Sequence, residues 1–338
     1  MRVRPSLLLV LALAAFATAG CQPLQFVVTI GSPDGELDRS VVIAEDHARG
    51  DVAIVDVSGM IVNAEQDGLL KRGGNPLTLL HQQLRRAERD DEVAAVLLRI
   101  NSPGGGVTAS EAMYREVMRF KARSGKPVVA VLMDVAASGG YYLACSADEI
   151  VAYPTTVTGS VGVILQTIGV GPALARIGVQ SEALTSGPNK DAGNPLGSLD
   201  DEEREVLQAM VDDFYLRFVE VVRTRRPGLS PEDFETVTDG RVVSGARAAE
   251  LGLVDATGDV YDAFVVAKQA AGLTRARLIR YHRPLQSVES PYAAPPRDGR
   301  ARAGRAGGEA PREIRVDLTP AFADLPPGFY YLWRPGVR

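Results

Sequence analysis

Two short apolar segments on either side of a helix-like segment most constrain the fold of this 338-residue chain. VAAVLLRI at 93–100 and KPVVAVLMD at 126–134 have the length of strands, and residues 111–125 between them have helical spacing and end at a glycine. Continuous apolar strands are typical of parallel sheets that helices cover on both faces. We therefore expect an α/β domain built on a mostly parallel sheet.

The same alternation of strands and helices continues along the chain. Residues 22–48 are mixed and turn-rich, and two interpretations stay open for them, a mobile stalk or an edge strand. The remaining expected elements are strands at 51–62, in EIVAYP (149–154) and in VGVILQ (161–166), and helices at 76–92, 138–147, about 200–226 and about 258–272.

The N-terminus has the layout of a secretory signal, with two arginines, an apolar run from Leu7 to Ala17 and small residues after it. The run is shorter than the roughly 20 residues that span a membrane. Thr18-Ala19-Gly20-Cys21 resembles a lipobox, although a leucine usually stands where Thr18 does. We expect Cys21 to carry a lipid that anchors the chain in the cell envelope, facing the periplasm or the exterior. Ordinary cleavage near Ala19 stays open.

Composition excludes some function classes. The net charge of −5 and the sequence pI near 5.4 give no electrostatic footprint for nucleic acid. The cysteines and histidines have no metal-ligand spacing, so we expect no metal and no cofactor. Cys145 lies in an apolar run and is expected to be a small buried hydrophobic residue.

A glycine-rich turn, RINSPGGGVTAS at 99–110, follows the buried strand and opens a helix. Glycine lets the backbone approach a ligand, and N–H groups at a helix N-terminus attract anions, so this turn can form an oxyanion site. The turn lacks the G-x-G-x-x-G order and the Lys-Ser/Thr of phosphate-binding loops. A tight turn without a ligand stays open as the alternative.

Ser138 follows the next buried strand in VVAVLMDVAASGG. It is expected at the carboxyl end of a strand, where ligands bind in open α/β sheets. A nucleophilic serine needs a base and an oxyanion site. The N–H of Gly139 and an N–H of residues 104–106 can supply the oxyanion site.

The base is not expected to be a histidine. The three histidines are His47 before the domain, His81 inside a polar helix segment and His282 near a linker. None of them stands at a strand end near a helix start, so a Ser-His-Asp triad is disfavoured.

A lysine is a candidate for the base. Only five of the 37 basic residues are lysines, and arginine does not lose its proton in proteins. Lys190 lies in LTSGPNKDAGNP, an irregular loop that can place a side chain in a site. Burial that lowers a lysine pKa from about 10.4 towards 7–8 makes it a general base. The alternative is a solvated lysine beside Asp191.

Five motifs in order, over about residues 50–275, resemble the signal peptide peptidase A family in its short bacterial form. They are INSPGGG, ASGGYYLACSADEIVA, TTVTGSVGV, LTSGPNKD and DGRVVSGARAAELGLVDATGD. The resemblance implies a Clp-protease/crotonase-like fold, an α/β fold of mostly parallel sheets with repeated ββα units. It also implies a Ser–Lys dyad in which Ser138 is the nucleophile and Lys190 the general base.

The resemblance assigns further roles. Ser160 matches the serine that hydrogen-bonds the lysine amine, and Gly105 and Gly139 match the oxyanion-hole glycines. It implies a membrane-associated serine endopeptidase that needs no cofactor and cleaves remnant signal peptides and other apolar envelope peptides. It also implies a homo-oligomeric ring.

The expected domain organisation follows from these features and from a change of composition beyond about residue 288. The aromatic C-terminal tail, residues 314–338, is expected to cover its own domain. If the tail instead docks in a substrate groove, deleting residues 289–338 should raise peptidase activity. The five parts are a signal peptide (1–20), a lipid-anchored stalk (21–49), a peptidase domain (50–288), a flexible linker rich in Pro, Gly, Ala and Arg (289–313) and an aromatic tail (314–338).

Two other functions fit parts of the sequence. A crotonase-like enzyme acting on acyl-CoA would have acidic catalytic residues and no export signal. An inactive lipoprotein scaffold would lack the nucleophile or the base, and both are present here. Peptidase activity directed at envelope proteins instead of signal peptides is compatible with the same residues.

Overall fold

The computed structural model describes residues 37–64, 67–68, 71–72, 74–282, 290–293 and 329–333. All of these belong to one compact unit, Leu37–Arg338. The expected signal segment, Cys21 and nearly all of the expected linker lie outside the described residues. Within them, no helix combines the length and the apolar character needed to cross a membrane.

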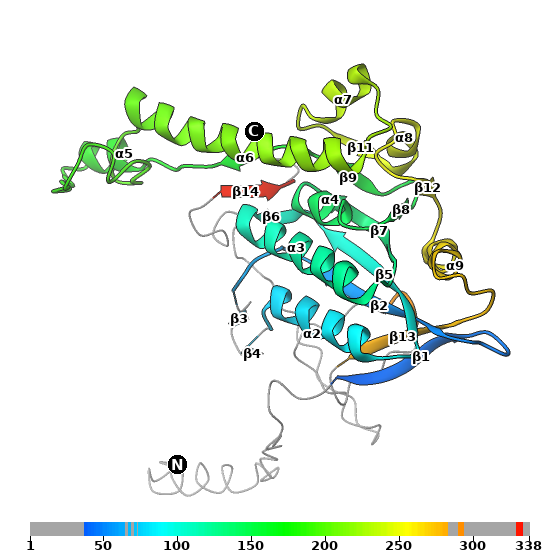
Figure 1. The fold of residues 1–338 in the computed structure, drawn as a ribbon. Coiled ribbons are helices and arrows are strands. Elements are labelled where there is room, and N and C mark those ends of the chain that lie inside the picture. The colour runs from blue at the N-terminus through cyan, green and yellow to red at the C-terminus, as the bar shows by residue number, and fades with distance from the viewer. Residues whose placement is uncertain are drawn as a thin grey trace, which may run out of the picture. The chain divides into compact units, whose positions relative to one another are not determined.

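The main sheet has nine strands and is mostly parallel (Figure 1). Its strand order is β1-β13-β2-β5-β7-β8-β12, and β9 pairs with both β7 and β11. Among the described residues of this sheet, the β1–β13 and β11–β9 pairs are antiparallel and the other pairs are parallel. The strands are β1 Asp38–Ala44, β2 Asp51–Ser58, β5 Val93–Ser102, β7 Val128–Ala137, β8 Glu149–Ala152, β9 Val157–Gly159, β11 Val242–Ser244, β12 Ala256–Thr257 and β13 Arg277–His282.

The helices and the remaining strands complete the fold. Two very short strands, β3 Asp67–Gly68 and β4 Lys71–Arg72, pair with each other, and a separate small sheet has the order β10-β14-β6. Its strands are β6 Gly104–Gly106, β10 Ile164–Leu165 and β14 Phe329–Leu332. The helices are α2 Pro76–Arg89, α3 Val107–Ser124, α4 Gly139–Ala144, α5 Gly171–Arg176, α6 Asp201–Arg225, α7 Pro231–Val237, α8 Gly245–Glu250 and α9 Val260–Ala270.

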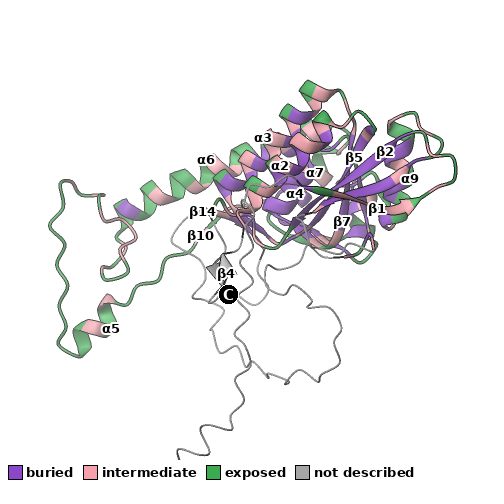
Figure 2. Cartoon of the chain, turned by 90° about the horizontal axis from the view of Figure 1, so that it is seen from below, coloured by how far each residue is buried: buried purple, intermediate pink, exposed green. Residues whose placement is uncertain are grey.

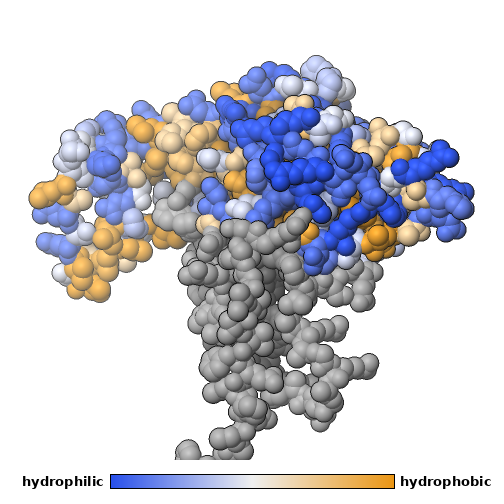
Figure 3. All heavy atoms as spheres, turned by 60° about the horizontal axis from the view of Figure 1, so that its bottom comes forward, coloured by the Kyte–Doolittle hydropathy of each residue, from blue (hydrophilic) through white to orange (hydrophobic). Residues whose placement is uncertain are grey.

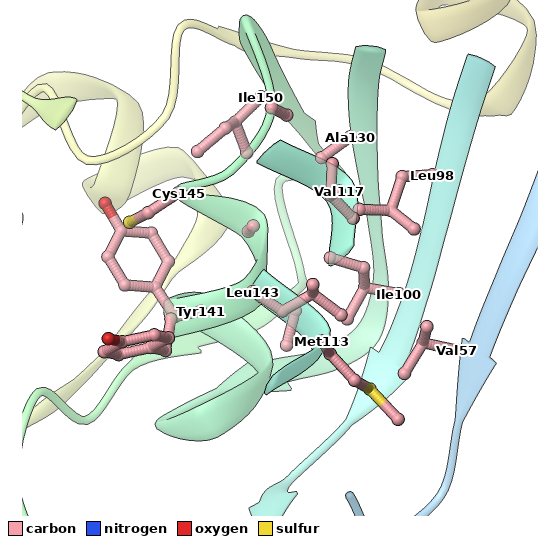
Figure 4. Close-up of a cluster of buried hydrophobic side chains, with 14 of the residues drawn as sticks. Val57, Leu98, Ile100, Met113, Val117, Ala130, Tyr141, Leu143, Cys145 and Ile150 are labelled. Carbon is pink, nitrogen blue, oxygen red and sulfur yellow. The ribbon is translucent and has the colours of Figure 1, made fainter. Parts of the chain in front are cut away.

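Both faces of the main sheet are buried, which explains the continuous apolar runs. Alternate residues of each strand point to opposite faces. On one face, Leu98 and Ile100 of β5 pack with Met113 and Val117 of α3 (Figure 4). On the other face, Leu97 packs with α9. The strands are therefore largely buried, whereas α5 and the segment around it are mostly exposed (Figure 2).

Most elements expected from the sequence are present, with shifted ends. The expected helix at 111–125 starts earlier, at Val107, directly after the glycine-rich turn, and ends where Gly125 adopts φ 68°. The expected strand at 51–62 ends at Ser58. The stretch before residue 49 contains an edge strand, β1, and the strand expected in VGVILQ shortens to β10.

Candidate active site

Ser138 links β7 to α4 in a strained conformation. Its backbone has φ 53° and ψ −117°, a region that side-chain-bearing residues rarely adopt. Two hydrogen bonds hold it there: the Ser138 N–H donates to the Gly159 carbonyl at 2.8 Å, and the Tyr142 N–H donates to the Ser138 carbonyl at 2.8 Å. The side chain is buried and its Oγ has no hydrogen-bond partner in the part of the chain that the structure describes. A strained serine with an unpaired hydroxyl at a strand-to-helix turn is typical of a nucleophile.

Ser160 lies at the matching position of the neighbouring strand. β7 and β9 are parallel, with Ala137 opposite Gly159, so the next residue of each strand is a serine. Ser160 also has φ 53°, and its N–H donates to the Arg241 carbonyl at 2.7 Å. The structure thus brings the two serines predicted from the sequence to one edge of the sheet.

Gly105 is held where only glycine fits. The Ile61 N–H donates to the Gly104 carbonyl, and the Gly106 N–H donates to the Ile61 carbonyl, each at 2.9 Å. A Cβ on Gly105 would collide with the Ile61 carbonyl. The glycine-rich turn is therefore pinned to the chain after β2.

Gly139 and the glycine-rich turn approach each other closely. A Cβ built on Gly104 would lie 2.8 Å from the Gly139 nitrogen, and one built on Gly139 would lie 3.2 Å from the Gly104 Cα. The turn at 104–106 and the residue after Ser138 are thus adjacent, which is the arrangement needed for an oxyanion site made of backbone N–H groups.

Lys190 is not brought to Ser138 within one chain. Its side chain is exposed, and within the described part of the chain its one hydrogen bond runs from its backbone N–H to the Gly187 carbonyl at 3.2 Å. Three other lysine amines are engaged elsewhere. They are Lys121, paired with Asp148 at 2.6 Å, Lys126, which donates to carbonyls of 87–90, and Lys268, paired with Glu45. Lys121 is therefore ion-paired and partly buried.

The histidines take no part in this site. His81 is exposed and pairs with Glu116 at 2.8 Å, and His282 lies 2.7 Å from the Ser40 hydroxyl. No described histidine hydrogen-bonds the Ser138 hydroxyl, which has no hydrogen-bond partner among the described residues.

The segment that carries Lys190 exposes many large apolar side chains. Figure 3 shows apolar residues gathered at the end of the molecule that holds α5 in Figure 1. A surface of this kind is typical of an interface. The exposed apolar residues from β10 to the loop before α6 are Ile164, Ile168, Val170, Ile177, Val179, Leu184 and Leu196.

A strained serine elbow beside a glycine-rich turn, in a mostly parallel α/β sheet, defines a Clp-protease-like protein. The Clp protease model matches residues 76–158, which confirms the predicted fold class. The model of peptidase family S49 matches residues 121–274. The chain belongs to peptidase family S49, as the comparison with individual relatives also shows.

Three relatives are similar over much of the chain. A putative protease of Synechocystis is 36% identical over 225 residues, which are 67% of this chain and 76% of the relative. A putative signal peptide peptidase SppA of Enterococcus faecium is 34% identical over 67% of this chain and 65% of its own length. Protease 4 of Salmonella typhi is 35% identical over 69% of this chain and 36% of its own length. The predicted family is therefore confirmed, and the chain spans less than two thirds of the length of the last two relatives.

The sequence did not reveal that part of the tail enters this region. β14 pairs with β6 at the glycine-rich turn and with β10. Tyr331 is fully buried there. The aromatic composition of the tail indicated that it docks, but nothing in the sequence indicated where.

Proposed function

We propose that the chain is a membrane-associated serine endopeptidase that uses a Ser138–Lys190 dyad to cleave remnant signal peptides and other apolar envelope peptides. The observation that carries the proposal is the strained, buried Ser138 with an unpaired hydroxyl beside the glycine-rich turn. Membership of family S49 supports the same chemistry.

The proposed reaction is acyl transfer. Lys190, as a neutral amine, accepts the hydroxyl proton of Ser138 while Oγ attacks the carbonyl carbon of the peptide bond. Backbone N–H groups at Gly105 and Gly139 stabilise the oxyanion that forms. The amine leaves with the proton, and water then hydrolyses the acyl-enzyme. Ser160, one strand away, is proposed to hold the lysine amine by a hydrogen bond.

A second copy of the chain is proposed to bring Lys190 to Ser138. In one chain the Ser138 hydroxyl has no hydrogen-bond partner among the described residues and Lys190 is exposed. The segment around Lys190 carries exposed apolar side chains that association would bury. The proposed homo-oligomer, a ring in the family to which the chain belongs, therefore completes the site as well as covering that surface.

Membrane association is proposed to depend on Cys21. Replacing this cysteine by serine removes the thiol to which a lipid attaches. The Cys21→Ser chain should move from the membrane fraction to the soluble fraction, while a Cys145→Ser chain should stay with the membrane. Retention of the Cys21→Ser chain on membranes would exclude a lipid at this residue as the anchor.

The catalytic proposal is tested by cleavage of a quenched apolar peptide. Ser138→Ala and Lys190→Arg should each abolish turnover, because arginine keeps the positive charge but cannot accept the proton. Lys121→Arg is the matched control, because its ion pair with Asp148 can be kept by arginine. Turnover by the Lys190→Arg chain comparable with that of the control would refute Lys190 as the base.

A further inference from the structure

Helix α6 is held to the domain along its second half. In that half, residues 214–225, Phe218, Val219 and Val222 are buried in the core. The first half, residues 201–213, buries Glu203 and is otherwise mostly exposed. At 1.5 Å per residue this half is about 20 Å long, and it runs out from the sheet towards α5 (Figure 1). The first half of α6 is therefore an arm that extends from a packed base.

The loop that carries Lys190 is attached to the free end of this arm. The Asn189 side-chain amide donates to the Glu202 carboxylate at 3.3 Å. The loop ends at Asp200, the N-cap of α6, which accepts the Glu203 N–H at 2.8 Å and completes a capping box. A capping box fixes the angle at which the chain enters a helix. The position of Lys190 therefore depends on the direction in which α6 points.

Arg225, the last residue of α6, holds the other end of the helix to α4. Its Nε donates to the Cys145 carbonyl and its Nη2 to the Ala147 carbonyl, each at 2.8 Å. Carbonyls at the end of a helix have no partner inside the helix, so they are free to accept these bonds. A planar guanidinium that uses two of its N–H groups at once fixes direction as well as distance. Arg225 therefore ties α6 to the helix that begins directly after Ser138.

The neighbouring Arg226 fixes a different part of the chain. It pairs with both carboxylate oxygens of Asp255, at 2.9 and 3.0 Å. Arg226 is the C-cap of α6, with φ −126° and ψ 60°, so it lies outside the helical geometry. It holds the point where α6 ends, whereas Arg225 lies in the last turn and constrains the direction of the helix.

The end of α4 has a second cationic partner. The Lys121 amine donates to the Ser146 carbonyl at 3.0 Å, between the two carbonyls that Arg225 binds. If Arg225 is replaced, α4 keeps this contact, while α6 loses its bonds to α4 through this side chain. Replacement of Arg225 should therefore disturb α6 more than α4.

We propose that Arg225 is a positioning residue for the general base: it sets the direction of α6 and thereby the place where Lys190 meets Ser138 of a neighbouring copy. The inference rests on the proposed dyad between copies. A tilt of about 5° at the base of the arm moves its free end by roughly 2 Å. A misplacement of about 1 Å in a reacting group can cost roughly a hundredfold in rate.

The test uses the full chain in two inactive forms, mixed so that subunits exchange and assayed on a quenched apolar peptide. The Ser138→Ala chain supplies Lys190, and the Lys190→Arg chain supplies Ser138. Adding Arg225→Gln to the Ser138→Ala chain should lower the recovered turnover by about tenfold or more, against less than about threefold when it is added to the Lys190→Arg chain. A general folding defect would act in either chain. Equal losses, or a larger loss in the chain that supplies Ser138, overturn the proposal.

Two further variants test the assignment to this side chain. Arg223→Gln is the matched control, because Arg223 is exposed and lies 5.0 Å from the Phe234 ring, away from α4. It should leave the recovered turnover unchanged in either chain. Arg225→Lys keeps the charge but not the two-pronged geometry, so it should restore part of kcat, with KM unchanged throughout. A loss in the Arg223→Gln chain equal to that in the Arg225→Gln chain overturns the assignment.

The direction of the arm is also measured without turnover, by electron–electron resonance between two nitroxides. The labels replace the exposed Gln208 on the arm and the exposed Arg119 on α3, in a Cys21→Ser, Cys145→Ser chain diluted with unlabelled chain. Arg225→Gln should broaden the distance distribution or shift it by about 2 Å. If no mixture regains turnover while this change is seen, the dyad between copies fails and the role of Arg225 in setting the arm stands. An unchanged distribution overturns the proposal.

Discussion

Ser138 and Ser160 directly follow two paired parallel strands, β7 and β9, at matching positions, and both have φ 53°. Ser138 has ψ −117°, and a backbone with this combination of φ and ψ favours glycine. Ser138 is therefore a serine in a backbone conformation that is strained for any residue with a Cβ. Such local strain is common at functional sites, where the surrounding structure enforces it.

Replacing Ser138 by glycine should stabilise the fold while abolishing activity. Glycine relieves the strained backbone, and we expect the free energy of unfolding to rise by about 1 kcal/mol relative to Ser138→Ala. Both variants lack the hydroxyl, so urea unfolding isolates the backbone effect. A Ser138→Gly chain less stable than the Ser138→Ala chain would show that the backbone at this position is not strained.

Neighbouring glycines of the turn should differ sharply in their tolerance of alanine. Gly105→Ala places a Cβ against the Ile61 carbonyl, so we expect turnover to be lost and the unfolding midpoint to fall. Gly106→Ala meets nothing closer than 3.9 Å and should keep most of the stability. Comparable thermal unfolding of the two variants would contradict the close approach of Ile61.

Releasing the tail should raise peptidase activity. The Tyr331 ring packs against the rings of Tyr142 and Phe218. Tyr331→Asp cannot bury its carboxylate among these rings, so β14 should separate from β6 and expose the site. Initial rates on a quenched peptide should rise severalfold. Tyr292→Ala, at an exposed aromatic residue that contacts Tyr261, is the control and should change little. Equal rates in the Tyr331→Asp chain and the wild type would mean that the tail does not compete with substrate.

Cys145 should be unreactive in the folded chain. Burial raises the pKa of its thiol to about 12, so at pH 8 almost none of it is the reactive thiolate. It lies beside the Tyr141 ring inside the core (Figure 4). In a chain that starts after Cys21, iodoacetamide should modify Cys145 only once urea is added. Rapid alkylation at pH 8 without urea would contradict this burial.

The parts of the fold that could be predicted are those that hydrophobic periodicity and backbone preferences over a few neighbouring residues determine. The apolar runs that became β5 and β7, the turn glycines and Ser138 follow from periodicity and from backbone preferences over a few residues. Ser160 needed the family resemblance, because a three-residue strand such as β9 has little pattern of its own. The choice of Gly105 within the glycine-rich turn needed it too.

The parts that were not predictable depend on contacts between distant segments. β14 pairs with residues more than 200 positions earlier, and a four-residue aromatic strand does not specify its partner. Lys190 was singled out as the unusual cation of an irregular loop, but no local rule gives the distance from such a loop to Ser138. Its exposed, apolar surroundings became visible only in the folded chain.

The most direct measurement mixes two inactive chains. Ser138→Ala and Lys190→Arg are each assayed on a quenched apolar peptide, alone and after equal amounts have been allowed to exchange subunits. The account predicts no turnover for either variant alone and recovery to about a quarter of wild type in the mixture, where some sites pair an intact Ser138 with an intact Lys190 of another copy. Turnover by Lys190→Arg alone would contradict the Ser–Lys dyad, and a mixture that stays inactive would contradict a dyad formed between copies.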